Sequence, residues 1–189
     1  MINYRRAVLD DAESIAKLHL ASWRETYTGL LPDQLIASKT VAERAAAWRR
    51  ILLTDCTSSE PHHRVFLATQ EGALLGFGSY GRQRDHEITA RGFTGEFSAI
   101  YILRRAQRRG IGRKLMTLMA AKLLHEGFHS ASLLVLRDNR AACEFYEHIG
   151  GAALSERNEE RGDLTLTEVI YGWSDLRQLA SPKSPEEKP

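Results

Sequence analysis

Cysteine is scarce in this sequence, with only Cys56 and Cys143 among 189 residues. Two cysteines are too few for the disulfide framework of a small secreted domain, and they lack metal-ligand spacing. Long apolar runs are also missing. No stretch approaches the roughly 20 apolar residues of a membrane span, and the start, MINYRRAVLDDAES, has no apolar signal core. We therefore expect a cytoplasmic protein without a membrane partner.

A strong charge of one sign is absent as well. The 26 lysines and arginines nearly balance 24 aspartates and glutamates, which leaves a net charge of +2 and little overall attraction to nucleic acid. Length and a hydrophobic content of 43% are typical of one globular domain. The end, SPKSPEEKP, is too polar to fold. We expect a single domain over residues 1–176 and a disordered tail over 177–189.

Apolar periodicity predicts alternating strands and helices. Helices are expected from about residue 11, after Pro32, from 111 and from 139, and the polar stretch 54–63 reads as a loop. A hairpin turn is expected at residues 71–72. Strands are expected at residues 2–8, 64–69, 73–80, 95–103, 132–136, 152–156 and 164–173. This order predicts an α/β (α+β) protein, a mixed sheet with helices on both faces.

Two short motifs suggest sites that their contexts do not support. HEGFH, residues 125–129, fits the H-E-x-x-H zinc pattern, but Gly127 is expected to end the helix and to turn His129 away from His125. GFGSYG, residues 76–81, fits a dinucleotide-binding pattern, but the residues after it show no helical stripe. We expect helix-end histidines at the first and a strand with small residues at the second.

A glycine loop at residues 107–112, QRRGIG, carries the strongest chemical signal. Gly110 and Gly112 allow the backbone to approach a ligand closely, and the helix that follows directs its amides and its positive dipole end at the same place. Six cations surround the loop: Arg104, Arg105, Arg108, Arg109, Arg113 and Lys114. This combination predicts a polyphosphate ligand.

The segments GEFSAIYILRRAQRRGIGRKLM and LLVLRDNRAACEFYEHIGG resemble the GNAT superfamily of acetyl-coenzyme A dependent N-acetyltransferases. The resemblance implies a mainly antiparallel central sheet flanked by helices, acetyl-CoA as co-substrate, and no metal. It implies that one strand pairs with the pantetheine arm, that the glycine loop holds the pyrophosphate, and that a helix-capping Asn139 also contacts the coenzyme. The strand and loop residues are Ile100, Tyr101, Ile102, Leu103, Gln107, Arg108, Arg109, Gly110, Ile111, Gly112 and Arg113.

The same resemblance implies two catalytic residues. An ammonium must lose a proton before it attacks a thioester, and Glu96 stands where the family commonly places the base, acting directly or through water. A hydroxyl that donates to the departing thiolate stabilises it, and Tyr146 is the candidate. The structural alternatives are that Glu96 is a solvated glutamate at a strand end and that Tyr146 is an inward-facing core aromatic.

The acceptor is less determined by the sequence. Trp23, Tyr27 and Tyr80 are candidates to line its site, and the glutamates of SERNEERG, residues 155–162, would attract a cationic amine. Small-molecule amines and peptide N-termini both fit. Two other functions stay open: a non-catalytic acyl-CoA binding module and, less favoured, nucleic-acid binding through the arginine cluster. Homodimers are common in the family, so a second copy is a further partner to consider.

Overall fold

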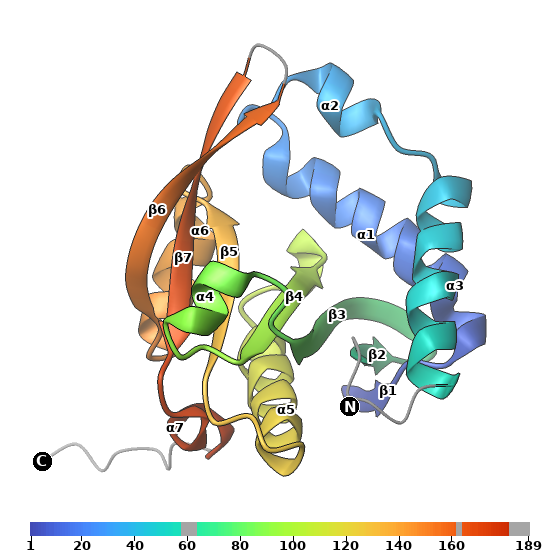
Figure 1. Cartoon of the computed structure of the whole chain (residues 1–189). Helices are drawn as coiled ribbons and strands as arrows, with labels where there is room; N and C mark the ends of the chain where they lie inside the picture. The colour runs from blue at the N-terminus through green and yellow to red at the C-terminus, as the bar shows by residue number, and fades with distance from the viewer. Residues whose placement is uncertain (58–63, 162–163, 182–189) are drawn as a thin grey trace, which may run out of the picture.

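One mixed sheet of seven strands organises the protein. The computed structural model describes residues 1–57, 64–161 and 164–181. The strand order is β1-β2-β3-β4-β5-β7-β6, and every neighbouring pair is antiparallel except β4 and β5 (Figure 1). This confirms the predicted fold class. The strands are β1 Asn3–Arg6, β2 Arg64–Gln70, β3 Ala73–Arg82, β4 Gly95–Ile102, β5 Ala131–Leu136, β6 Ala152–Arg161 and β7 Leu164–Trp173.

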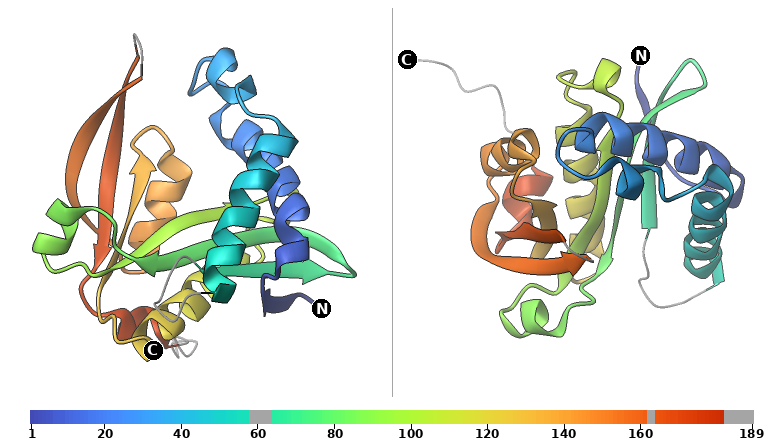
Figure 2. Two further views of the ribbon diagram at one scale, coloured as in Figure 1. Left: turned by 45° about the vertical axis from the view of Figure 1, so that its right-hand side comes forward. Right: turned by 90° about the horizontal axis from the view of Figure 1, so that it is seen from above.

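Helices cover both faces of this sheet. On one face, α1 and α3 enclose an apolar cluster with residues such as Phe77, and on the other, α5 and α7 enclose the larger cluster. Figure 2 shows α1 and α3 lying together, apart from α5. The helices are α1 Ala12–Tyr27, α2 Asp33–Ala37, α3 Val41–Thr57, α4 His86–Ala90, α5 Ile111–His125, α6 Arg140–His148 and α7 Leu176–Ala180, with 3-10 turns η1 Leu9–Asp11 and η2 Arg104–Ala106.

Several elements differ from the sequence prediction, among them β6, which continues to Arg161 and does not end at residue 156. The predicted loop at 54–63 begins later, since α3 continues to Thr57, and residues 58–63 lie outside the described residues. The unpredicted helix α4 forms because Asp85 accepts hydrogen bonds from its first amides. The tail predicted from 177 starts too early, because Leu179 of α7 is buried against α5. Residues 182–189 of that tail lie outside the described residues.

Both discounted motifs have the structures that we expected. Helix α5 ends at His125, and Gly127 has φ +85°, so His129 does not continue the helical face. Within the described ranges, no group of three or more potential metal-ligating side chains gathers. The motif GFGSYG is part of β3, where a Cβ on Gly78 would lie 2.7 Å from the sulfur of Met119. Small residues there allow α5 to pack closely on the sheet.

Among the described residues, none of the helices combines the length and apolar character that crossing a bilayer requires.

Candidate active site

The sheet divides along the line between β4 and β5. In the described part of the chain these strands pair only at Gly95 with Ala131 and at Glu96 with Ser132, although β4 continues beside β3 to Ile102. The β3–β4 register shifts between Ser79 and Tyr80. This bulge places one extra residue in β4, so the strand bends. Beyond Glu96, the β4 edge that faces β5 is therefore open to a ligand with polar groups.

The glycine loop leads directly from this edge into α5. Gly110 is the N-cap and has φ +77°, a conformation that side chains disfavour, and within the described chain no side chain caps the helix. Lys114 donates the first helical hydrogen bond, to the carbonyl of Gly110, so the amides of residues 111–113 have no partner in the helix. An uncapped N-terminus with free amides fits a phosphate group.

Residues within and beside the glycine loop form hydrogen bonds with neighbouring elements. The backbone amide and guanidinium of Arg104 donate to Glu25 of α1, at 2.7 and 2.6 Å. Arg109 donates to the side chain of Gln70 at 2.7 Å, and Gln107 donates to the carbonyl of Ile102 at 3.1 Å. These contacts hold the loop against its neighbours.

Helix α6 begins beside the same opening. The Asn139 side chain accepts a hydrogen bond from the amide of Ala142 at 3.4 Å, which confirms the predicted capping role. Phe145 of α6 lies against α5, where a Cβ on Gly112 would lie 3.0 Å from its ring. Gly112 is therefore required for the contact between the two helices.

Glu96 lies at the last position where β4 pairs with β5 and is almost fully buried, with 6% of its surface exposed. Arg84 binds it with two hydrogen bonds, Nε to Oε2 at 3.0 Å and Nη2 to Oε1 at 2.6 Å. The sequence prediction did not include Arg84. The fork fixes the carboxylate plane and leaves each oxygen a further lone pair to accept a proton.

Three tyrosines approach one another near the opening. Tyr101 of β4 is hydrogen-bonded to Tyr27 of α1. Both tyrosines interact electrostatically with Tyr146 of α6. Burial, followed by the neighbouring Tyr27 hydroxyl and Cys143, raises the pKa of Tyr146 above its ordinary value. Burial likewise raises the pKa of Tyr101. Both hydroxyls stay protonated at neutral pH and are therefore hydrogen-bond donors.

Comparison with known proteins identifies this arrangement. The model of the acetyltransferase (GNAT) family matches residues 16–151. The uncharacterized N-acetyltransferase YuaI of Bacillus subtilis (strain 168) is 35% identical over 180 residues, which cover 95% of this chain and 96% of that protein. The chain belongs to the GNAT acetyltransferase family. It is an acetyl-CoA dependent N-acetyltransferase by this membership.

Solved structures agree with the GNAT fold. An N-acetyltransferase from Staphylococcus aureus Mu50 aligns with a TM-score of 0.71 and 19% identity, over 93% of this chain and 99% of that one. The PaiA N-acetyltransferase from Thermoplasma acidophilum, solved in complex with coenzyme A, aligns with a TM-score of 0.69 and 18% identity, over 89% and 98% of the two chains. At these identities, the likeness concerns the fold.

The predicted acceptor residues separate onto the two faces of this GNAT sheet. Trp23 and Tyr27 pack together on α1, with ring centroids 4.3 Å apart, and Trp23 also lies near Tyr101. Tyr80 is instead fully buried on the α5 face, stacked on Phe66. The structure does not bring Tyr80 together with Trp23 and Tyr27, because Tyr80 follows Phe77 by three positions in β3 and so faces the opposite side of the sheet.

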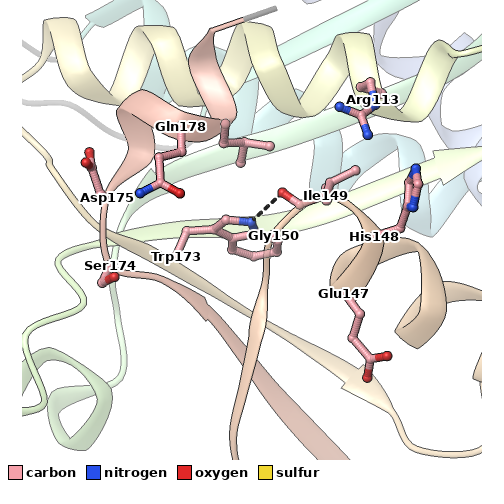
Figure 3. Close-up of a pocket in the computed structure, with 10 residues that line it drawn as sticks. Arg113, Glu147, His148, Ile149, Gly150, Trp173, Ser174, Asp175 and Gln178 are labelled. Atoms are coloured by element: carbon pink, nitrogen blue, oxygen red, sulfur yellow. Dashed lines mark hydrogen bonds between the residues drawn. The ribbon is translucent and has the colours of Figure 1, made fainter. Parts of the chain in front are cut away.

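A pocket of about 270 Å³ lies at the ends of α5, α6 and β7. Figure 3 shows Arg113 and His148 on one side of it and Asp175 and Gln178 of the α7 region on the other. The Trp173 indole forms part of the wall and donates to the carbonyl of Ile149 at 3.2 Å. Sequence reasoning missed this pocket because its walls come from separate element ends, and only Arg113 belongs to the predicted coenzyme contacts.

A buried histidine predicts that acid will destabilise the protein. The His19 ring accepts a hydrogen bond at Nδ1 from the Trp48 indole, and burial lowers the pKa of His19 from 6.5 to about 3. Below pH 6.5 the unfolded chain binds a proton that the folded chain excludes, so stability falls with pH. Between pH 7 and 4.5 this group should remove about 2 to 3 kcal/mol of unfolding free energy.

Denaturant unfolding at both pH values measures this effect. His19→Gln retains an acceptor for Trp48 without a titrating ring, so we expect its stability to change less with pH than that of the parent. Equal losses in both proteins would contradict the role given to His19.

Proposed function

We propose that this enzyme transfers the acetyl group of acetyl-CoA directly to a primary amine of a small molecule or a peptide. The observation that carries the proposal is the opening between β4 and β5 beside an uncapped, glycine-led helix N-terminus. Free amides at residues 111–113 would hold the pyrophosphate, and the unpaired β4 edge would bind the pantetheine arm. When bound, acetyl-CoA supplies the activated acyl group.

Glu96 acts as general base in this proposal, directly or through one water. Its carboxylate is held by two hydrogen bonds from Arg84 at the last position where β4 pairs with β5, so its orientation is fixed. A base in a fixed position typically contributes a factor of about 10² to 10⁴ to the rate. The proton taken from the acceptor ammonium makes the nitrogen lone pair available for attack.

Tyr146 donates a hydrogen bond or proton to the departing sulfur. Burial keeps its hydroxyl protonated at neutral pH, and the Tyr101 and Tyr27 side chains lie close enough to affect it. Hydrogen bonds to charged groups contribute about 1.5–3 kcal/mol, which corresponds to a rate factor of about 10 to 100. Asn139 and the loop cations would complete the coenzyme site.

Acetyl-CoA consumption across a panel of amines tests the function. We expect thiol release that depends on the amine, together with calorimetric binding of acetyl-CoA. Binding of acetyl-CoA without acetylation of any amine would favour a non-catalytic binding module. The nucleic-acid alternative predicts steeply salt-dependent binding of DNA or RNA in place of acetyl-CoA.

Tyr146→Phe separates chemistry from binding. The variant keeps the ring contacts with Tyr171 and Trp173 but loses the hydroxyl. We expect kcat to fall about 10- to 100-fold while the affinity for acetyl-CoA changes little. Cys143→Ser, which changes a nearby group with no assigned role, is the control and should retain turnover. An unchanged kcat in Tyr146→Phe would remove Tyr146 from the mechanism.

A further inference from the structure

A half-buried arginine on α3 has no acidic partner. The Nε atom of Arg44 is shielded from solvent and, within the described residues, finds no hydrogen-bond acceptor. Its neighbour Glu43 is already engaged, since its carboxylate accepts from the amide and hydroxyl of Thr40. None of the ion pairs in the described ranges includes Arg44. A shielded N–H donor without an acceptor is costly, so this nitrogen favours the binding of an acceptor such as a carboxylate oxygen.

The surroundings of Arg44 supply further donors. The Trp48–His19 hydrogen bond marks where α3 meets α1, and Arg44 lies one turn before Trp48, while Ser22 lies one turn after His19. Both positions lie toward the ends that α2 connects (Figure 1). Ser22 is 1% exposed, and in the described part of the chain its hydroxyl also lacks a partner. Two shielded polar groups without partners thus lie on the same side of the helix contact.

His19 presents a donor in the same region. Because Nδ1 accepts from Trp48, the proton of the neutral ring is on Nε2. The ring lies against Tyr101, with centroids 4.4 Å apart and planes tilted by 34°. The Arg44 charge adds to the lowering of the His19 pKa and partly offsets the rise in the Tyr101 pKa that burial causes. Arg44 therefore lies near the β4 residue that flanks the opening. Trp23 and Tyr101, like Arg44, are only half-buried.

The location separates this anion site from the coenzyme phosphates. Arg44 belongs to the helices of the α1 and α3 face, whereas the glycine loop leads into α5, which covers the opposite face. A thioester that enters from the α5 side would be reached by the amine from the α1 side. The anion that Arg44 binds would then belong to the acceptor.

The β6–β7 hairpin does not offer a comparable site for a polycation. Glu156 is paired with Arg137 at 3.4 Å, and Glu160 accepts from the Thr165 hydroxyl at 2.9 Å. Glu168 is bound by Arg157 at 3.0 Å. These three carboxylates have partners within the protein, whereas Arg44 takes part in none of the ion pairs of the described residues.

We propose that the acceptor amine carries a carboxylate that Arg44 binds, with Ser22 and His19 as additional donors. The proposal rests on the proposed acetyltransferase function and names its substrate class. A free amino acid and the acidic residue of a short peptide share this chemistry. Arg44 is here a specificity-determining residue, since it contacts the acceptor away from the reacting nitrogen.

Kinetics with matched acceptors test the proposal. The panel pairs free amino acids with their amides, and dipeptides that contain an aspartate or glutamate with those that contain asparagine or glutamine. We expect the acids to exceed their amides in kcat/KM by about tenfold or more, because a charge-assisted hydrogen bond is lost in the amide. Preference among the free amino acids alone, or among the dipeptides alone, identifies the source of the carboxylate.

Variants on one helix assign the preference. Arg44→Gln should lose the preference by lowering kcat/KM for the acids about 10- to 100-fold, with little change for the amides and in the KM for acetyl-CoA. Arg44→Lys keeps the charge and should retain part of the preference. Arg50→Gln, at an exposed position of the same helix, should behave as the parent. Equal rates for acids and amides in the parent, or an equal loss for both in Arg44→Gln, would overturn the proposal.

A binding measurement keeps this test independent of turnover. Calorimetry of the full chain with coenzyme A compares N-acetyl amino acids, the expected products, with their amides. Binding of the acids that Arg44→Gln abolishes supports the anion site even if no amine is acetylated, in which case the proposed function alone fails. Absence of any difference between acids and amides would refute the anion site even in an active enzyme.

Discussion

Gly110→Glu should weaken acetyl-CoA binding about a hundredfold or more. The added carboxylate would stand at the N-cap of α5, where the amides of residues 111–113 are free. It would cap the helix itself and repel a phosphate, and a like-charge contact costs several kcal/mol, with 1.4 kcal/mol per factor of ten. Titration calorimetry with acetyl-CoA measures the loss directly.

Two control variants separate charge from backbone strain. Gly110 has φ +77°, and in the described structure nothing lies within 4 Å of a Cβ placed there, so Gly110→Ala introduces the strain alone. We expect less than about a tenfold change in affinity for it. Gly92 has φ +90° and similar open space away from the loop, so Gly92→Glu adds both strain and charge elsewhere. If Gly92→Glu lost affinity as Gly110→Glu does, the effect would be global and the loop would not be the phosphate site.

Glu96→Gln is expected to lower kcat by about 10²- to 10⁴-fold, with acetyl-CoA affinity nearly unchanged. The amide cannot take a proton from the acceptor ammonium, and this is the usual range for losing a positioned general base. Steady-state turnover with a saturating amine measures the effect. Retention of kcat within about threefold would mean that Glu96 is a structural partner of Arg84 and not the base.

Arg84→Gln is the companion variant. It leaves the Glu96 carboxylate in place but removes both hydrogen bonds that fix its plane. The Arg84 side chain is 65% exposed, so little packing is lost. We expect a smaller reduction in kcat than for Glu96→Gln. Thermal melting of both variants shows whether the buried carboxylate tolerates the loss of its cation.

Local signals in the sequence carried much of the fold. Apolar spacing predicted α5, a glycine predicted its end, and Asn139 predicted the start of α6 through capping. The turn at Glu71 and Gly72 was predicted from the two strand-like runs that flank it, and both residues take positive φ, at +51° and +79°. These features depend on residues close together in the chain, so the local sequence is enough to predict them.

Features that depend on distant pairs were not predictable. The β4 bulge, which leaves Ser98 without an opposite residue in β3, results from the register between two strands and not from one residue. Arg84 reaches Glu96 only because β3 and β4 are paired. Arg44 and His19 come close together only because α1 and α3 are in contact, which the sequence does not indicate. Short helices such as α7 form through tertiary packing, which local propensity does not record.

The sparse pairing between β4 and β5 also affects how cooperatively the whole molecule unfolds. Two residue pairs join a unit of β1 to β4 with a unit of β5, β7 and β6, so few interstrand hydrogen bonds oppose their separation. The larger apolar cluster beneath α5 contains residues of both units, so apolar packing and not strand pairing holds them together. A ligand lying along the line between β4 and β5 would bind only the closed form and would make the two units unfold together.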